Sequence, residues 1–319
     1  MSRKGFVKLS EEELHKQIAQ YEKQEGNLKR YGLLGAIIGL IGLLICMALE
    51  SGMVLIFLTI LLVGGVCFYR GVRLRRKAES LVREQLDDFF ESELEKTFGP
   101  RMDTPEMSIN ASFLEEIHPV DRHWTHRQVL RSYEGIHHEV HFSAANVELY
   151  KFNQCAEEDS SQAATETLFK GVVLRCKDIC NPTWDIALRR SWEDNHKSDL
   201  TDSAVFQQHF SARAADDQPA DNLVTPQLRE LIRNLESLSN DYRVIALIFR
   251  DGEAILALAG WFSFADGLPS GGKSLQNLDG IRRRFTASLT PMGDLIDILR
   301  DSCGKRTAAD SKSSSAIMS

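Results

Sequence analysis

The sequence predicts an α+β protein: an N-terminal transmembrane hairpin of two helices, followed by a cytosolic domain with a mostly antiparallel sheet and flanking helices. Two observations carry this prediction. Two apolar stretches without charges follow each other between residues 31 and 70, and strand-like and helix-like segments joined by turns begin near residue 107. The 319-residue chain has a net charge of −7, so we expect no nucleic-acid partner.

Residues 1–30 are predicted to form a cytosolic helix. Ser10 and Glu13 have the spacing of a capping box, in which the two residues satisfy each other's backbone N–H groups. Leu14, Ile18 and Tyr21 then recur at helical spacing, which gives this helix an apolar face.

Residues 31–70 are predicted to form the two spans. Each apolar stretch holds about 17 to 18 uncharged residues, just enough for a helix to cross a bilayer. Only residues 50–52 separate them, so we expect antiparallel helices, with Ser51 as the cap of the second. The alternative is a buried helical hairpin of a soluble protein. Small residues that favour close helix packing recur along both stretches: Gly32, Gly35, Gly39, Gly42, Gly64 and Gly65.

Basic residues flank these spans on one side. Lys29 and Arg30 precede the first span, the connecting turn has none, and five follow the second: Arg70, Arg73, Arg75, Arg76 and Lys77. The positive-inside rule therefore predicts that both termini are cytoplasmic. The same five residues are the candidate site for anionic lipid headgroups, and a topology signal alone explains them equally well.

Residues 71–99 are predicted to hold a basic juxtamembrane segment and an amphipathic helix that ends at Gly99-Pro100. Its apolar residues recur every four positions: Val82, Leu86, Phe90, Leu94 and Phe98. Two alternatives stay open. The helix continues the hairpin as a stalk beside the N-terminal helix, or it packs on the downstream domain.

Residues 107–304 are predicted to form the cytosolic α+β domain. We expect one strand over 133–152, with a bulge near Ala145 because the alternation changes phase there. A polar hairpin loop over 156–166 leads to a second strand. Farther on, Asp251-Gly252 joins two apolar strands in a hairpin.

Helices in this domain are expected where a Thr-Pro pair opens an apolar stripe, at Thr225 and again at Thr290. Residues 305–319 are small and polar, and they are expected to form a disordered tail.

Residues 267–274, GLPSGGKS, match the spacing of a phosphate-binding loop through Gly267, Gly272, Lys273 and Ser274. Such a loop follows a strand of a parallel βαβ unit and opens a helix whose N–H groups face the phosphates. Here the preceding strand is predicted to belong to an antiparallel hairpin. We therefore favour a flexible connector, with a nucleotide-binding enzyme as the alternative.

Histidines gather between residues 118 and 141, and imidazole is the commonest metal ligand in proteins. The candidate ligands are His123, His126, His137 and His141. A site would require the loop before the strand to fold over the sheet, so exposed histidines are the simpler interpretation. We predict no catalytic residue and no cofactor, because the sequence holds no nucleophile motif or dinucleotide fingerprint.

The order of these features resembles a bacterial membrane family catalogued as domain of unknown function 3137. The matching pieces are LFKGVVL (168–174), the spaced Phe206 and Phe210, LVTPQLRELI (223–232), the hairpin over 242–259 and GDLIDILRD (293–301). The resemblance covers about residues 25–302 and departs at the glycine-rich stretch after the hairpin. It implies a bacterial cytoplasmic membrane location and supplies no activity, so no catalytic residue follows from it.

The sequence therefore favours a non-enzymatic role. The hypothesis is a membrane-anchored interaction module that binds protein partners, itself or anionic lipid. The alternatives are a nucleotide-binding enzyme that uses GLPSGGKS and a histidine-based, metal-dependent activity.

Overall fold

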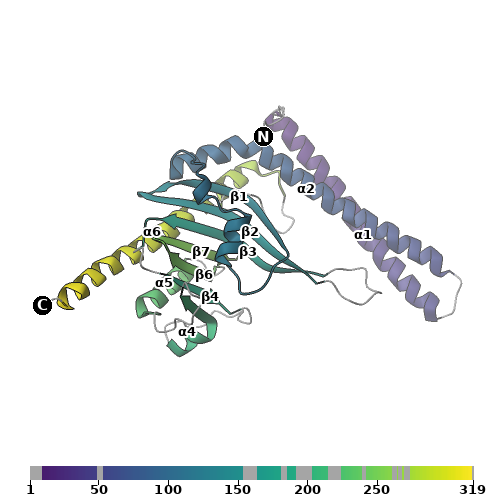
Figure 1. The fold of residues 1–319 in the computed structure, drawn as a ribbon. Coiled ribbons are helices and arrows are strands. Elements are labelled where there is room, and N and C mark those ends of the chain that lie inside the picture. The colour runs from purple at the N-terminus through teal and green to yellow at the C-terminus, as the bar shows by residue number, and fades with distance from the viewer. Residues whose placement is uncertain are drawn as a thin grey trace. The chain divides into compact units, whose positions relative to one another are not determined.

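The structure is a computed structural model, and it confirms the α+β class: two long apolar helices precede a seven-stranded antiparallel sheet with helices (Figure 1). It describes residues 9–48, 53–153, 164–180, 185–191, 203–214, 224–238, 242–260, 264, 268 and 274–317. The chain forms two compact units. We call residues 1–91 with 267–285 the hairpin unit, and residues 92–266 with 286–319 the sheet unit.

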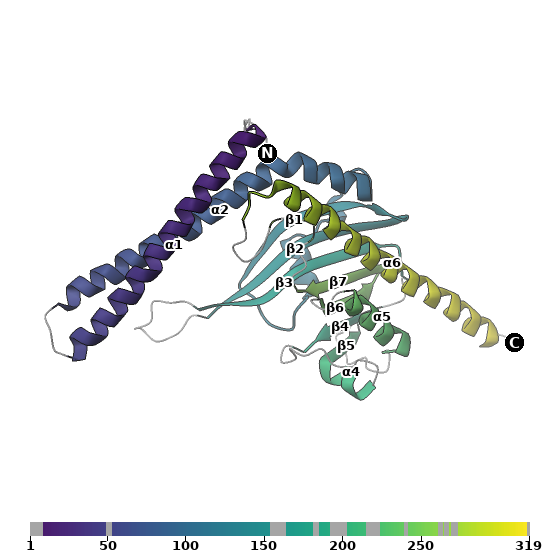
Figure 2. The same cartoon turned by 180° about the vertical axis from the view of Figure 1, so that it is seen from behind.

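Two continuous helices form most of the hairpin unit, α1 (Glu11–Ala48) and α2 (Val54–Phe98). They lie side by side in both views (Figures 1 and 2). The predicted capping box opens α1: the Ser10 amide donates to Glu13 at 3.0 Å, and the Glu13 amide donates to the Ser10 hydroxyl at 3.3 Å. The predicted limits at residues 30 and 70 are not structural breaks, because each helix runs through them. Ser51 lies outside the described residues.

Glycine brings the two helices into backbone contact, as predicted. A Cβ atom at Gly39 would lie 2.7 Å from the backbone nitrogen of Leu61, and one at Gly32 would lie 2.6 Å from that of Phe68. Gly64 is equally close to α1, whereas a Cβ at Gly65 would meet nothing within 4 Å. Gly32, Gly39 and Gly64 therefore lie at the interface between the two helices.

Within the hairpin unit, α2 packs beside α1, as the first of the two alternatives for residues 71–99 predicted. Leu14 and Ile18 of α1 are buried, as are Val82 and Leu86 of α2, and the Leu9 amide donates to the Gln85 side chain at 3.2 Å. The last residues of α2 belong to the sheet unit and pack on it, as the second alternative predicted. There the ring of Phe98 contacts that of Phe142 edge to face, with centroids 5.1 Å apart. Each alternative therefore describes one part of this helix.

Every strand pair in the sheet is antiparallel, and the strand order is β1-β2-β3-β7-β6-β4-β5. The strands are β1 (His126–His137), β2 (Val140–Asn153), β3 (Ala164–Lys177), β4 (Ile186–Arg190), β5 (Phe210–Ala214), β6 (Arg243–Arg250) and β7 (Glu253–Ala259). The predicted hairpin at Asp251-Gly252 joins β6 to β7, and both turn residues have positive φ, 49° and 81°. Such values are those of the tight turn that Asp-Gly favours.

Helices cover both faces of this sheet. On one face, α3 (Ala111–Ile117) buries Phe113 and Leu114 in a cluster with Val147 and Val173. On the other lie α5 (Pro226–Ser237) and the later part of α6 (Leu278–Ile317), as Figure 2 shows. Thr225 caps α5 as predicted, since its side chain accepts from the Leu228 amide. The remaining helices are short, η1 (Pro105–Met107) and α4 (Ser203–His209).

The structure corrects the single strand expected over 133–152. A tight turn at His138 and Glu139 splits it into β1 and β2, with φ values of 44° and 71°. The register irregularities lie between Val129 and Ser132 and at Leu149/Tyr150, not near Ala145. The turn has no glycine or asparagine, which are the residues that normally signal positive φ, so the pattern resembled one long strand.

The second correction concerns α6. Thr290 and Pro291 do not start a helix, because α6 begins at Leu278 and carries Pro291 in its interior. Pro291 removes one backbone donor, and the buried Leu289, Met292 and Leu295 around it hold the helix in place. The helix also continues to Ile317 through the tail expected to be disordered. Extending an existing helix needs no new nucleation, and no proline follows residue 291.

Candidate functional site

The paired helices expose an apolar surface that a water-soluble protein would bury. Leu55, Leu62 and Leu44 are 72%, 64% and 60% exposed. In the most apolar windows of the two helices, with mean hydropathy of 1.7 and 2.1, only 17% and 11% of the residues are buried. Both helices are thus long and apolar enough to cross a membrane, and their outward surface does not fit the core helices of a soluble protein.

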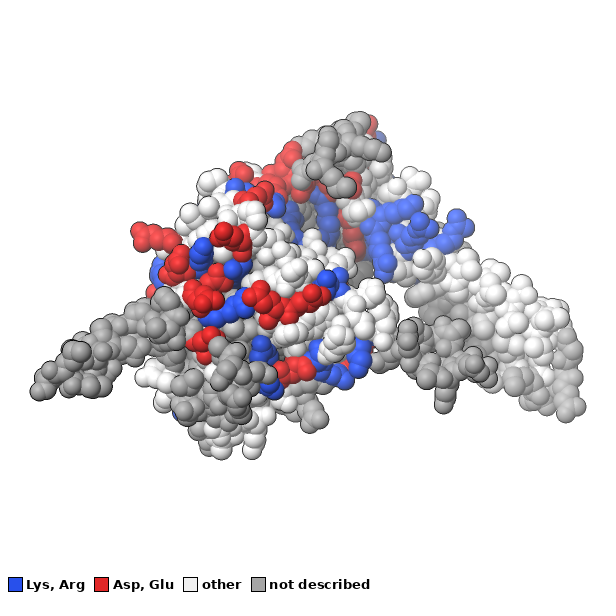
Figure 3. All heavy atoms as spheres, in the orientation of Figure 1, with Lys and Arg blue, Asp and Glu red and all other residues white. Residues whose placement is uncertain are grey.

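Exposed basic side chains follow this apolar surface along α2. Figure 3 shows Lys and Arg gathered on the helix pair, next to a stretch free of charged atoms. Arg70, Arg73, Arg76 and Lys77 are all exposed, and no salt bridge to a described residue engages them. Arg75, the fifth predicted headgroup ligand, differs: it is buried at 8% exposure. The candidate lipid-binding set therefore reduces to four residues.

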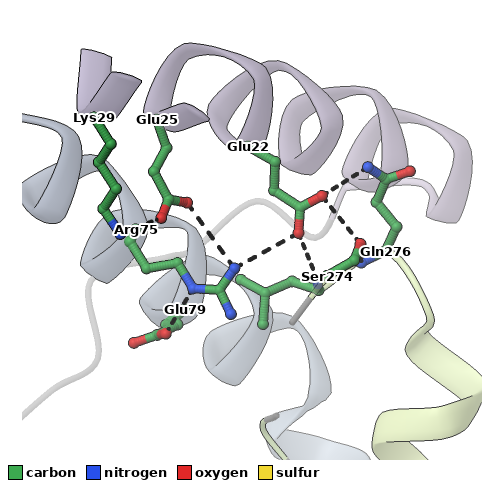
Figure 4. A network of polar contacts seen from close by, with 8 residues as sticks. Glu22, Glu25, Lys29, Arg75, Glu79, Ser274 and Gln276 are labelled. Carbon is green, nitrogen blue, oxygen red and sulfur yellow. Dashed lines mark hydrogen bonds and ion pairs between the residues drawn. The ribbon is translucent and has the colours of Figure 1, made fainter. Parts of the chain in front are cut away.

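Arg75 is the centre of a polar network between α1 and α2 (Figure 4). Its guanidinium lies 2.9 Å from Glu79, 3.7 Å from Glu22 and 4.0 Å from Glu25. Glu25 also accepts from Lys29 at 2.7 Å. Because three carboxylates surround this arginine, its charge holds the helix pair together and does not face a ligand.

The same network binds the end of GLPSGGKS. The Ser274 hydroxyl donates to Glu22 at 3.0 Å, and the Leu275 amide donates to the other carboxylate oxygen at 2.5 Å. Gln276 donates to Glu22 at 2.7 Å (Figure 4). Helix α6 begins only at Leu278, and β7, the strand before this stretch, is antiparallel to both its neighbours.

This arrangement lacks the features that a phosphate loop needs. Ser274, which would hold magnesium, is bonded to a carboxylate and does not open the helix. Gly267, Gly272 and Lys273 lie outside the described residues.

The four histidines predicted as metal ligands are not brought together. His123 is exposed, and the ring of His126 packs on Phe152 with centroids 4.5 Å apart. His141 lies 2.8 Å from Glu134. His137 is part of a different cluster, which the sequence did not predict.

That cluster consists of His137, His138 and Asp297. His138 Nδ1 lies 2.9 Å from Asp297 Oδ1, and His137 Nε2 lies 3.5 Å from Oδ2. Burial lowers the pKa of His137, and the neighbouring His138 lowers it further, against the attraction of Asp297. Burial raises the pKa of Asp297, but bonding to His138 and the charges of His137 and Arg300 outweigh it, so the pKa is lowered overall. The Asp297 carboxylate is therefore ionised at neutral pH, and His137 takes up a proton less readily than a free imidazole does.

Glu134 forms a second buried polar centre in the sheet unit. It accepts from the Thr104 amide at 2.8 Å and lies beside His141. Burial raises its pKa, but the hydrogen bonds from Thr104 and His141 outweigh that effect, and the pKa is lowered overall. This carboxylate ties the segment before α3 to β1.

A surface hollow of about 810 Å³ lies next to the start of β1. Its basic lining residues are His118, Arg122, His123, Arg127, Arg189 and Arg213. Arg122 and Arg127 each pair with a glutamate, and Arg189 donates to two carbonyls at the end of α3. These arginines stabilise the wall of the hollow, and we assign it no ligand.

No family model, curated protein or solved structure matches this chain. The resemblance to domain of unknown function 3137 therefore stays a prediction.

Proposed function

We propose that this chain is a membrane-anchored interaction module. In this proposal α1 and α2 cross the bacterial cytoplasmic membrane, both termini lie in the cytoplasm, and the sheet unit is presented at the inner leaflet. The observation that carries the proposal is the exposed apolar surface of a tightly packed helix pair. Such a surface is stable only when lipid or protein covers it.

The exposed apolar surface of α1 and α2 fits a lipid environment better than a protein partner. The exposed apolar side chains occur all along residues 31–45 of α1 and 53–69 of α2, and not in one stripe. A partner protein would bury one face of each helix, whereas lipid surrounds the pair on all outward sides. Glycine contacts between the helices meet the requirement for close association in lipid.

The basic residues support the proposed orientation and a contact with anionic headgroups. Arg70, Arg73, Arg76 and Lys77 are exposed in the turns of α2 that follow the apolar stretch. Each contributes about 1 kcal/mol of attraction to an anionic leaflet. Together they favour the cytoplasmic side for this end of the hairpin.

Reporter fusions test the topology. Green fluorescent protein at the C-terminus of the full chain should fluoresce, because it folds in the cytoplasm, and alkaline phosphatase at the same place should be inactive. Fusions at the N-terminus should give the same pair of results. Active phosphatase at either end would contradict the orientation, and a chain released from membranes by carbonate washing would contradict the spans.

Headgroup binding is tested separately with the full chain in detergent micelles, to which anionic phosphatidylglycerol is added. Binding of this lipid to the chain in the mixed micelles should weaken when Arg73 and Arg76 are both replaced by Gln. Arg283 and Arg284, which are exposed on α6, provide a matched control pair. Equal weakening by both pairs would show that general charge, and not the juxtamembrane set, attracts lipid.

Protein partners are tested by cross-linking in intact membranes. The proposal expects defined cross-links from the sheet unit to a second copy or to a specific membrane protein. Recovery of abundant bystanders only, at the same level as for an unrelated two-span protein, would count against the interaction role.

A further inference from the structure

We infer that His137, His138 and Asp297 form a binding site for a divalent transition metal, with zinc as the best fit. The three residues each offer one ligand atom, and these atoms all lie within 4.8 Å of one another. All three belong to the sheet unit. The inference is independent of the proposed membrane function, and it uses only one of the four histidines that the sequence favoured.

The distances between the donor atoms suit one ion. In a tetrahedral zinc site with bonds of about 2.1 Å, ligand atoms are separated by about 3.4 Å. His138 Nδ1 is 2.9 and 3.2 Å from the two oxygens of Asp297, and His137 Nε2 is 3.5 Å from Oδ2. Bringing the two imidazoles closer requires rotation of His138, whose side chain is 61% exposed and has room to move.

The donor set selects the class of metal. Two imidazole nitrogens and one carboxylate oxygen suit zinc, cobalt or iron, whereas calcium and magnesium prefer oxygen ligands alone. Three protein ligands leave a coordination position for water. A site of this kind has the composition of a catalytic zinc centre and not that of a closed structural one.

The backbone positions these ligands with an unfavourable conformation at one of them. His138 occupies a turn position with φ of 44°, where glycine or asparagine is normally found. His137 ends β1, and its ring lies against α6 at Gly293, where a Cβ atom would lie 3.1 Å from the imidazole. Asp297 lies one turn farther along α6. A hairpin turn and a helix separated by 159 residues thus present three metal-binding groups to one point.

Arg300 is the group that competes with a metal ion. Its Nη1 lies 3.3 Å from Asp297 Oδ1. The same guanidinium also donates to Asp301 at 3.1 Å and to the carbonyl of His138 at 3.4 Å. It therefore keeps two partners when the Asp297 carboxylate turns to a metal. Removing its positive charge should strengthen metal binding by about 10-fold.

The test uses the untagged full chain in detergent micelles, stripped with a chelator and then titrated with Co²⁺. We expect one equivalent to bind at micromolar concentration, with the visible absorption bands of four- or five-coordinate cobalt, and Zn²⁺ to displace it. His138→Asn keeps a residue suited to positive φ, and Asp297→Asn keeps the shape of the side chain; each should weaken binding at least about 100-fold. Arg300→Gln should strengthen it.

His126→Asn is the matched control and should bind as the unmodified chain does. The inference is overturned if the unmodified chain binds no cobalt at micromolar concentration. It is also overturned if His138→Asn or Asp297→Asn, folded by circular dichroism, binds as tightly as the unmodified chain. Loss of binding in His126→Asn equal to that in Asp297→Asn would move the site to the histidines upstream and would equally refute the assignment.

Discussion

Two adjacent glycines in α2 offer opposite outcomes for the same substitution. Gly64 faces α1: a methyl group there would lie 2.7 Å from the backbone nitrogen of Ala36 and 2.9 Å from the carbonyl oxygen of Gly32. At Gly65, nothing lies within 4 Å of the same position. Alanine at the first position therefore pushes the helices apart, whereas at the second it meets open space.

Two contributions set the expected difference in stability between Gly64→Ala and Gly65→Ala. In a helix interior, alanine is more favourable than glycine by about 1 kcal/mol, so Gly65→Ala should stabilise the hairpin by up to that amount. At Gly64 the same gain is opposed by overpacking, which costs about 1–3 kcal/mol. The helices would have to separate until the 2.7 Å approach reaches ordinary contact at 3.4 Å or more. We therefore expect the two variants to differ by about 1–3 kcal/mol.

The assay is a titration of SDS into mild-detergent micelles that hold the full chain. Separation of the helices is followed by Förster transfer between one dye on α1 and one on α2, both outside the apolar stretches. Gly64→Ala should lower the SDS midpoint relative to Gly65→Ala. Equal midpoints for the two variants would refute the backbone contact between the helices.

Two further predictions concern carboxylates that accept backbone hydrogen bonds, the partly buried Glu22 and the buried Glu134. Glu22→Ala removes the acceptor of the buried Leu275 amide, so hydrogen exchange at that amide should accelerate about 10- to 100-fold, while Glu12→Ala on the exposed surface should leave it unchanged. Glu134 has a pKa below its ordinary 4.5 in the folded chain, so its stabilising effect is complete above pH 4.5 and is lost as the pH falls through the lower folded value. Thermal stability should fall in that acid range, and Glu134→Gln should flatten the fall; an unchanged pH profile would contradict this.

Local signals explain why much of the fold follows from the sequence. The capping box at Ser10, the Thr225 cap and the Asp251-Gly252 turn each act within three or four residues. Their physical causes, a side chain satisfying a nearby amide or a glycine allowing positive φ, are visible in a short window of sequence. The signal of the two apolar stretches is equally local, because composition and length alone define it.

The predictions from sequence that proved wrong lie where local preference and tertiary structure disagree. The turn at His138 and Glu139 uses residues that do not signal a turn, and Pro291 signals a helix start where packing maintains a helix interior. The His138–Asp297 contact joins residues 159 apart, which no local pattern encodes. One feature of the sequence is consistent with this contact: Gly293 precedes Asp297 by four residues and lies on the same helix face, where the ring of His137 can approach.

The contacts at the end of GLPSGGKS show that a sequence motif identifies a binding site only when its structural surroundings also fit. A serine hydroxyl and a backbone amide that point to one place bind an anion, whether or not that anion is a phosphate. In this chain both donors bind Glu22, whose carboxylate belongs to the same polypeptide and to the same hairpin unit. A covalently linked anion acts at high effective concentration, so a free phosphate would have to displace it. Arg75 lies 3.7 Å from the same carboxylate, and displacing Glu22 would also cost part of the network that joins α1 to α2. The Ser274 hydroxyl and the Leu275 amide thus attach the start of the segment before α6 to helix α1, which is a structural use of anion binding.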